Sequence, residues 1–124
     1  MSSAAASRSV AANVGIFANE QDALDAVVSR LVNALDPESV WLFGSRARGT
    51  GRPDSDFDIL VVGKEHSDFD GDDYDRVYAP LKGLAVGVDV VPCDYETFRA
   101  SLGLQTSLVR RIVDEGRLIY GAGT

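Results

Sequence analysis

The stretch GSRARGTGRPDSDFDILVV, residues 44–62, decides the fold of this 124-residue chain. It follows the apolar run VWLF (40–43) and ends in the apolar run ILVV (59–62), and both runs are typical of β-strands. The polar residues between the runs therefore lie at strand ends, where α/β proteins bind their ligands. Asp56 and Asp58 are two residues apart on a strand, so we expect their side chains on the same face of the sheet.

This carboxylate pair is a candidate metal site. Two like charges so close together repel each other unless a cation lies between them. Magnesium is the cation that we expect, because it prefers carboxylate oxygen and usually carries the phosphates of a substrate. Asp56 and Asp58 are therefore predicted metal ligands.

The residues that precede the acids predict a phosphate site. Gly44 has no Cβ, so its backbone can approach a ligand closely, and Ser45 offers a hydroxyl at the start of a short helix. Helix starts bind anions, and the guanidinium groups of Arg46 and Arg48 match phosphate oxygens. A flexible return loop is expected through Gly49, Gly51 and Pro53. The whole set predicts a site for a triphosphate and its metal.

Gly44-Ser45, ten intervening residues and Asp56-Phe57-Asp58 resemble the GSx10DxD motif of the minimal nucleotidyltransferase family, within the DNA polymerase beta-like superfamily. The third acid of that family lies on a later strand, and its counterpart here is Asp89, a lone acid in the apolar segment GVDVVP. The resemblance extends from Leu24 to Tyr120. It implies that the catalytic, metal-binding residues are Asp56, Asp58 and Asp89, which hold Mg²⁺ as a pair of ions. It also implies ATP as the donor, with its phosphates contacted by Gly44, Ser45, Arg46 and Arg48.

By the same resemblance, the chain moves AMP from ATP to a hydroxyl group. Minimal members of the family pair with a separate helical HEPN protein, and the implied role is an antitoxin that adenylylates a tyrosine of a HEPN toxin. The chain ends without the extra helical domain that forms the acceptor site in larger relatives, so we expect a partner to supply the acceptor. Two alternatives stay open: a small-molecule nucleotidyltransferase that works as a homodimer, and a non-catalytic antitoxin that neutralises its partner by binding.

Length and composition predict one domain. The chain has 45% hydrophobic residues, which suits one domain with a modest core. We expect this domain over residues 19–124, and the resemblance implies that it is a nucleotidyltransferase domain. Residues 1–18 are expected to be a disordered tail. The single cysteine, Cys93, permits no intramolecular disulfide. No signal peptide or membrane-length apolar run is visible, so we expect a cytoplasmic protein without membrane contact.

Net charge and the arrangement of charged residues limit the classes of partner that we expect. A net charge of -7 argues against extended nucleic-acid binding, which depends on Lys and Arg at the phosphates. The acidic segment KEHSDFDGDDYDRVY, residues 64–78, lacks the Gly and Glu positions of an EF-hand, and we interpret it as a solvated loop that leads into a helix. With one histidine, His66, and one cysteine, we expect neither a zinc site nor a Cys-His nucleophile pair.

Hydrophobic periodicity predicts the remaining elements. A helix with Asn19 as N-cap is expected to end before Pro37, and Gly116 is expected as the C′ residue of a late helix. Strands are predicted over Ser39–Phe43, Phe57–Val62, Ala85–Val91 and Leu118–Tyr120. Further helices are predicted over Tyr74–Lys82, from Asp94 through Leu102, and around Leu108–Val113. The order α-β-α-β-α-β-α-α-β predicts an α/β (α+β) fold with a small mixed sheet and helices mainly on one face, compatible with the nucleotidyltransferase fold.

Overall fold

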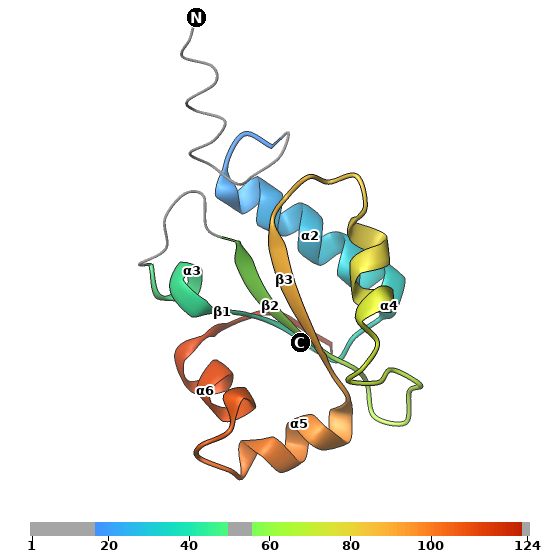
Figure 1. The fold of residues 1–124 in the computed structure, drawn as a ribbon, viewed down its shortest axis with the longest axis vertical. Coiled ribbons are helices and arrows are strands. Elements are labelled where there is room, and N and C mark those ends of the chain that lie inside the picture. Colours follow the sequence, from blue (N-terminus) through green and yellow to red (C-terminus); the bar gives the residue numbers. More distant parts are fainter. Residues whose placement is uncertain (1–16, 50–55, 123–124) are drawn as a thin grey trace, which may run out of the picture.

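A four-stranded mixed sheet forms the centre of the computed structural model, which describes residues 17–49 and 56–122 (Figure 1). The elements are α2 (Glu20–Leu35), β1 (Ser39–Phe43), α3 (Gly44–Arg48), β2 (Phe57–Val62), α4 (Tyr74–Tyr78), the 3-10 helix η1 (Ala79–Leu81), β3 (Val88–Cys93), α5 (Tyr95–Leu102), α6 (Leu108–Glu115) and β4 (Arg117–Gly121). This order confirms the predicted alternation of helices and strands. The predicted tail, up to residue 16, and the return loop with Gly51 and Pro53 lie outside the described residues.

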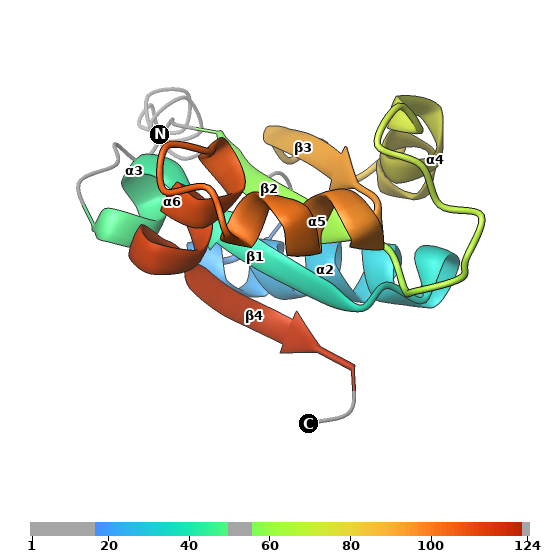
Figure 2. The same ribbon diagram turned by 90° about the horizontal axis from the view of Figure 1, so that it is seen from below.

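The strands are arranged in the order β3-β2-β1-β4. β1 pairs antiparallel with both β2 and β4, whereas β2 and β3 run parallel. Figure 2 shows β3 and β4 at opposite edges of the sheet, with α4 on the β3 side. The start of β2 and the start of β3 therefore lie beside the end of β1, which leads directly into α3.

β3 begins later than predicted. The predicted strand Ala85–Val91 is in fact Val88–Cys93. Ala85 has a left-handed φ of 59°, and pairing starts where the Phe57 amide donates to the Gly87 carbonyl at 3.0 Å. Pro92 is tolerated within the strand because β3 is an edge strand, where a missing N–H is least costly.

The predicted helix Tyr74–Lys82 is also divided. α4 ends at Tyr78 and continues only as the 3-10 turn η1, which contains Pro80 near its start. Proline has no N–H to donate and its ring crowds the preceding turn, so the α-helical pattern does not continue through it.

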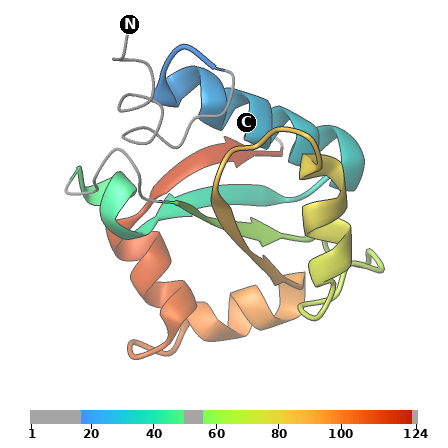
Figure 3. The ribbon, with the colours of Figure 1, turned by 45° about the horizontal axis from the view of Figure 1, so that its top comes forward.

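Helices cover both faces of the sheet, so the expectation that they pack mainly on one face is wrong. Figure 3 shows α2 on one side of the strands and α5 with α6 on the other. The cause is visible in β2, where Ile59 and Val61 belong to the core beneath α2, and Leu60 and Val62 belong to the core beneath α5 and α6. A strand that is apolar on both sides must be covered on both sides.

The predicted helix starts are confirmed by their caps. The side chain of Asn19 accepts from the Asp22 amide at 2.9 Å, which fixes the start of α2. The Asp94 carboxylate accepts from the Thr97 amide at 3.0 Å and caps α5 in the same way. Within the described residues, no helix is both long and apolar enough to cross a membrane.

Gly116 joins α6 to the sheet by close approach. It follows α6 as predicted, but its φ of -88° is not left-handed, so conformational freedom is not the reason for glycine here. A Cβ at this position would lie 2.5 Å from the Ile112 carbonyl oxygen and 2.6 Å from the Leu42 carbonyl oxygen. Only glycine lets the end of α6 pack directly on β1.

We therefore expect Gly116→Ala to lower the free energy of unfolding by about 1–3 kcal/mol, because two backbone carbonyls must move to admit the methyl group. Urea unfolding followed by circular dichroism measures this change. Gly103→Ala is the matched control: φ is -81° and the nearest atom to the added Cβ is 3.6 Å away, so a change within about 1 kcal/mol is expected. Equal effects of the two substitutions would contradict the close-approach explanation.

Candidate active site

The sheet brings the predicted acids to one place. Asp58 of β2 lies directly opposite Asp89 of β3 in the parallel register, and Asp56 precedes β2 by one residue. Asp58 is also the antiparallel partner of Phe43, which belongs to the core beneath α5 and α6. The side chain of Asp58 therefore lies on the α5–α6 face, at the end of the sheet where β1 leads into α3. Asp58 is half-buried, whereas Asp56 and Asp89 are exposed.

The backbone of Gly44 lies against the Asp58 carboxylate, because glycine has no side chain to keep them apart. Its φ is +77°, a left-handed conformation that favours glycine, and a Cβ built there would collide with the Asp58 carboxylate oxygen Oδ2. The turn from β1 into α3 thus passes directly over the carboxylate. Glycine at this position leaves the space that the Asp58 carboxylate occupies.

The acids repel one another. Burial raises the pKa of Asp58, the negative charges of Asp89 and Asp56 raise it further, and the positive charge of Arg48 lowers it. A cation between these carboxylates would offset their repulsion. The chemistry of this donor set therefore fits Mg²⁺.

The acids do not form a finished metal cage. Across residues 17–49 and 56–122, no group of three or more His, Cys, Asp or Glu side chains is arranged to hold a metal ion. Magnesium commonly uses one or two carboxylates together with water and substrate phosphate, so a closed cage is not required. The fit rests on the opposed pair Asp58 and Asp89 and on the raised pKa of Asp58.

The two arginines of α3 have different surroundings. The side chain of Arg46 is only 4% exposed; its guanidinium lies 4.1 Å from the centre of the Phe57 ring and pairs with Glu20 of α2. Arg46 thus fastens α3 to the α2 side of the molecule. Arg48 is exposed, and its charge acts on Asp58. Ser45 is half-buried in the first turn of α3, but Phe43, not Ser45, occupies the N-cap position.

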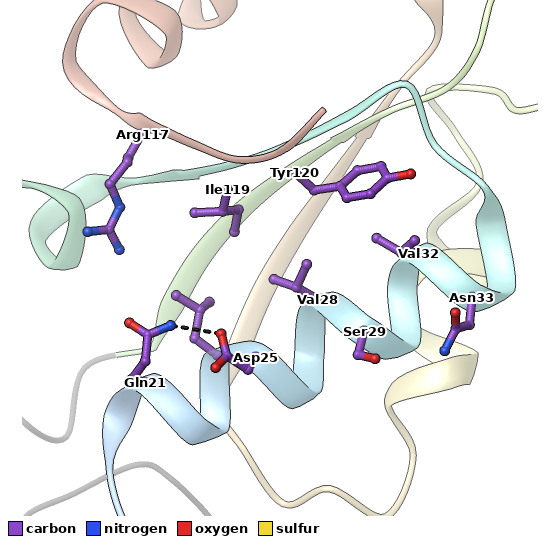
Figure 4. Close-up of a pocket in the computed structure, with 10 residues that line it drawn as sticks. Gln21, Asp25, Val28, Ser29, Val32, Asn33, Arg117, Ile119 and Tyr120 are labelled. Carbon is purple, nitrogen blue, oxygen red and sulfur yellow. Dashed lines mark hydrogen bonds between the residues drawn. The ribbon is translucent and has the colours of Figure 1, made fainter. Parts of the chain in front are cut away.

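A cavity of about 420 Å³ lies on the other side of the sheet, between α2 and β4 (Figure 4). Its apolar lining, which includes Val28, Val32 and Ile119, belongs to the α2 core. On its rim, Gln21 Nε2 donates to Asp25 Oδ1 at 2.7 Å. The cavity is therefore separated from the acids by the sheet.

A smaller cavity of about 210 Å³ lies beside the acids, between α3 and α6. Its lining includes Gly44 and Arg48 from the motif, and Leu108, Arg111 and Ile112 from α6. In the described part of the chain, neither Arg48 nor Arg111 forms an ion pair with a carboxylate. Sequence reasoning missed Arg111, because no spacing links α6 to the motif.

The other titratable groups that the sequence singled out are occupied elsewhere. In the acidic segment, Arg76 pairs with Asp68 at 3.3 Å and with Asp73 at 3.2 Å, and exposed turns lead into α4, as predicted. Burial raises the pKa of Cys93 to about 11, so its thiol stays protonated at neutral pH. His66 is exposed and lies in the segment that follows the end of β2, whereas Asp58 lies near the start of that strand.

The chain is similar to known nucleotidyltransferase domains. The nucleotidyltransferase domain model matches residues 24–119. No curated protein shows a significant match. Among solved structures, a candidate nucleotidyltransferase from Sulfolobus solfataricus is 21% identical with a TM-score of 0.47, and the match covers 87% of this chain and 94% of that chain. Because the family model spans most of its length, this chain belongs to the nucleotidyltransferase domain family.

Proposed function

We propose that this chain is a Mg²⁺-dependent enzyme that transfers AMP from ATP to a tyrosine hydroxyl of a basic partner protein, a HEPN toxin, and so acts as its antitoxin. The observation that carries the metal-dependent chemistry is the placement of Asp58 opposite Asp89, beneath the turn at Gly44. The partner and the acceptor come from the resemblance of the GSx10DxD motif to minimal nucleotidyltransferases.

The residues divide the chemistry among them. Mg²⁺ would be held by Asp56, Asp58 and Asp89, and when bound it neutralises charge on the transferring phosphoryl group. The acceptor oxygen bonds to the α-phosphorus of ATP as the bond to pyrophosphate breaks. Asp89, the more exposed of the two opposed acids, would accept the proton that the hydroxyl loses.

Positive charge for the phosphates comes from the α3–α6 cavity. Arg48, Arg111 and Glu115 line it, and neither guanidinium group forms an ion pair with a carboxylate among the described residues. Guanidinium groups match phosphate oxygens, whereas Arg46 is committed to Glu20 and Phe57. We therefore assign the phosphate contact to Arg48 rather than to Arg46.

A partner suits the surface around this cavity. Leu108, on its lining, is 54% exposed, and Leu104, in the connection between α5 and α6, is 60% exposed. In this proposal the two exposed leucines pack against the partner protein. The net charge of -7 favours a basic partner, since complementary charge speeds association.

Replacing Asp58 by Asn tests the catalytic assignment. The substitution keeps the shape and removes the charge, so transfer of radiolabel from α-labelled ATP should fall by about 100-fold or more while the fold is kept. Asp25→Asn is the control, because Asp25 is exposed on α2, at the cavity that the sheet separates from the acids, and it should transfer at the parent rate. Undiminished transfer by Asp58→Asn would contradict the assignment.

The same variant has a defined effect on stability in the absence of metal. Because the folded-state pKa of Asp58 is raised above 3.8, the folded parent binds more protons than the unfolded chain above that pH and loses stability as the pH rises through the folded pKa. Asn does not titrate. The stability of Asp58→Asn relative to the parent should therefore increase from pH 3.8 upwards and then level off. A relative stability that falls over this range would show that Asp58 is stabilised as an anion.

The two arginines should respond differently to alanine. Arg48→Ala should raise the KM for ATP by about 10-fold with little loss of stability, because a charge-assisted phosphate contact is lost. Arg46→Ala should chiefly lower the melting temperature, because a buried contact with Phe57 and Glu20 is lost. Separate KM, kcat and thermal unfolding measurements distinguish the two. Equal, negligible effects of the two substitutions on KM, kcat and melting temperature would contradict both assignments and show that the arginines are ordinary surface charges.

Co-expression with a HEPN protein, taken from a reading frame next to this one where such a frame exists, tests the acceptor. Intact mass measurement should show one or more added AMP units on the partner, and none when Asp56→Ala replaces the parent. A neutralised partner that never gains mass would instead support neutralisation by binding. Efficient modification of a small hydroxylated compound by the chain alone would support the homodimeric small-molecule enzyme.

A further inference from the structure

Tyr78, the last residue of α4, contacts both Asp89 and the backbone beside it. The Val90 amide donates to the Tyr78 hydroxyl at 2.9 Å, and the same hydroxyl lies 3.4 Å from Asp89 Oδ1. A phenol has a single proton to donate and accepts through its lone pairs. Because the Val90 bond uses the oxygen as an acceptor, the phenolic proton is available to Asp89.

The Val90 bond explains why Tyr78 stays in this place. β3 is an edge strand, so N–H groups on its outer side have no neighbouring strand. One of these groups, the Val90 N–H, donates to the Tyr78 hydroxyl instead of to a strand carbonyl. The preceding residue, Val77, is fully buried in the α2 core and holds α4 against the protein. The position of the hydroxyl is therefore fixed by its bond to the Val90 amide and by the packing of Val77.

We propose that Tyr78 is a positioning residue for Asp89, an inference that rests on the function proposed above. Its hydroxyl holds Oδ1, so the carboxylate keeps one orientation on the exposed edge of β3. In the described residues Oδ2 accepts no hydrogen bond, which leaves it for a cation or for the acceptor proton. The bond is long for O–H···O, as such bonds often are before the reactants bind.

The sequence predicts neither the contact of Tyr78 with Val90 nor its contact with Asp89. Tyr78 lies in the helix predicted between two strands, and nothing marks its side chain as different from that of Tyr74 in the same helix. Tyr74 is 50% exposed, and its hydroxyl forms no hydrogen bond with the described residues. The difference between the two tyrosines comes only from the packing of α4 beside the edge of β3.

The test compares Tyr78→Phe with Tyr74→Phe. Mn²⁺ is titrated in the presence of α,β-methylene-ATP, which cannot release pyrophosphate, and binding is followed by the rise in melting temperature. Groups that orient a metal ligand typically contribute 10- to 100-fold, so Tyr78→Phe should need about 10-fold more Mn²⁺ for the half-maximal rise. Tyr74→Phe should match the parent. With ATP, kcat of Tyr78→Phe should fall by a similar factor while KM stays within about 2-fold.

A double-mutant cycle separates positioning from a general loss of structure. If Tyr78 acts through Asp89, then Tyr78→Phe should change the Mn²⁺ midpoint no further in the Asp89→Asn background. An equal change in both backgrounds, or no change in the parent background, would overturn the proposal. Stable attachment of AMP to Tyr78, seen by intact mass, would also overturn it, because the residue would then be an acceptor.

The outcomes also distinguish this inference from the proposed function. A parent protein that transfers AMP and responds to Mn²⁺, with Tyr78→Phe equal to it, would remove only the role of Tyr78. A parent protein that shows neither transfer nor a response to Mn²⁺ would overturn the proposed function, and the role of Tyr78 with it.

Discussion

The parallel pairing of β2 with β3 is the constraint on which the site depends. It places Asp58 opposite Asp89, so two carboxylates that repel each other are held together by backbone hydrogen bonds and by a core on both faces of the sheet. Burial, together with this repulsion, raises the pKa of Asp58. Such a pair favours a bound cation, because positive charge between the carboxylates offsets their repulsion.

The surrounding elements adjust this pair. Gly44 brings the backbone of the β1–α3 turn against Asp58, and Arg46 fastens α3 to α2 through Glu20. On the far side, Tyr78 contacts Asp89 from α4. Residues from two connections, α3 between β1 and β2 and α4 between β2 and β3, thus contact the acids, while β2 and β3 carry Asp58 and Asp89. A small domain can hold these repelling acids because the paired strands fix their positions, while the connections supply the residues that contact them.

The sequence predicts the strands, the order of the elements and the convergence of the acids, because these follow from local apolar patterns and from one compact motif. It predicts the boundaries of β3 poorly, because the start of pairing is set by Phe57 on the neighbouring strand. It also misses the two-sided covering of the sheet, which depends on which helix meets which face. Arg111 and Tyr78 cannot be found from spacing at all, since only tertiary packing brings them to the motif.

The most direct test of the shared cation is paramagnetic broadening of backbone amide signals by Mn²⁺ in the ¹⁵N-labelled protein. The account predicts that substoichiometric Mn²⁺ broadens the amides of Gly44, Asp58 and Asp89 first, and that Asp58→Asn removes this effect. Broadening centred on the acidic segment, residues 64–78, with the signals of Asp58 and Asp89 unchanged, would contradict it.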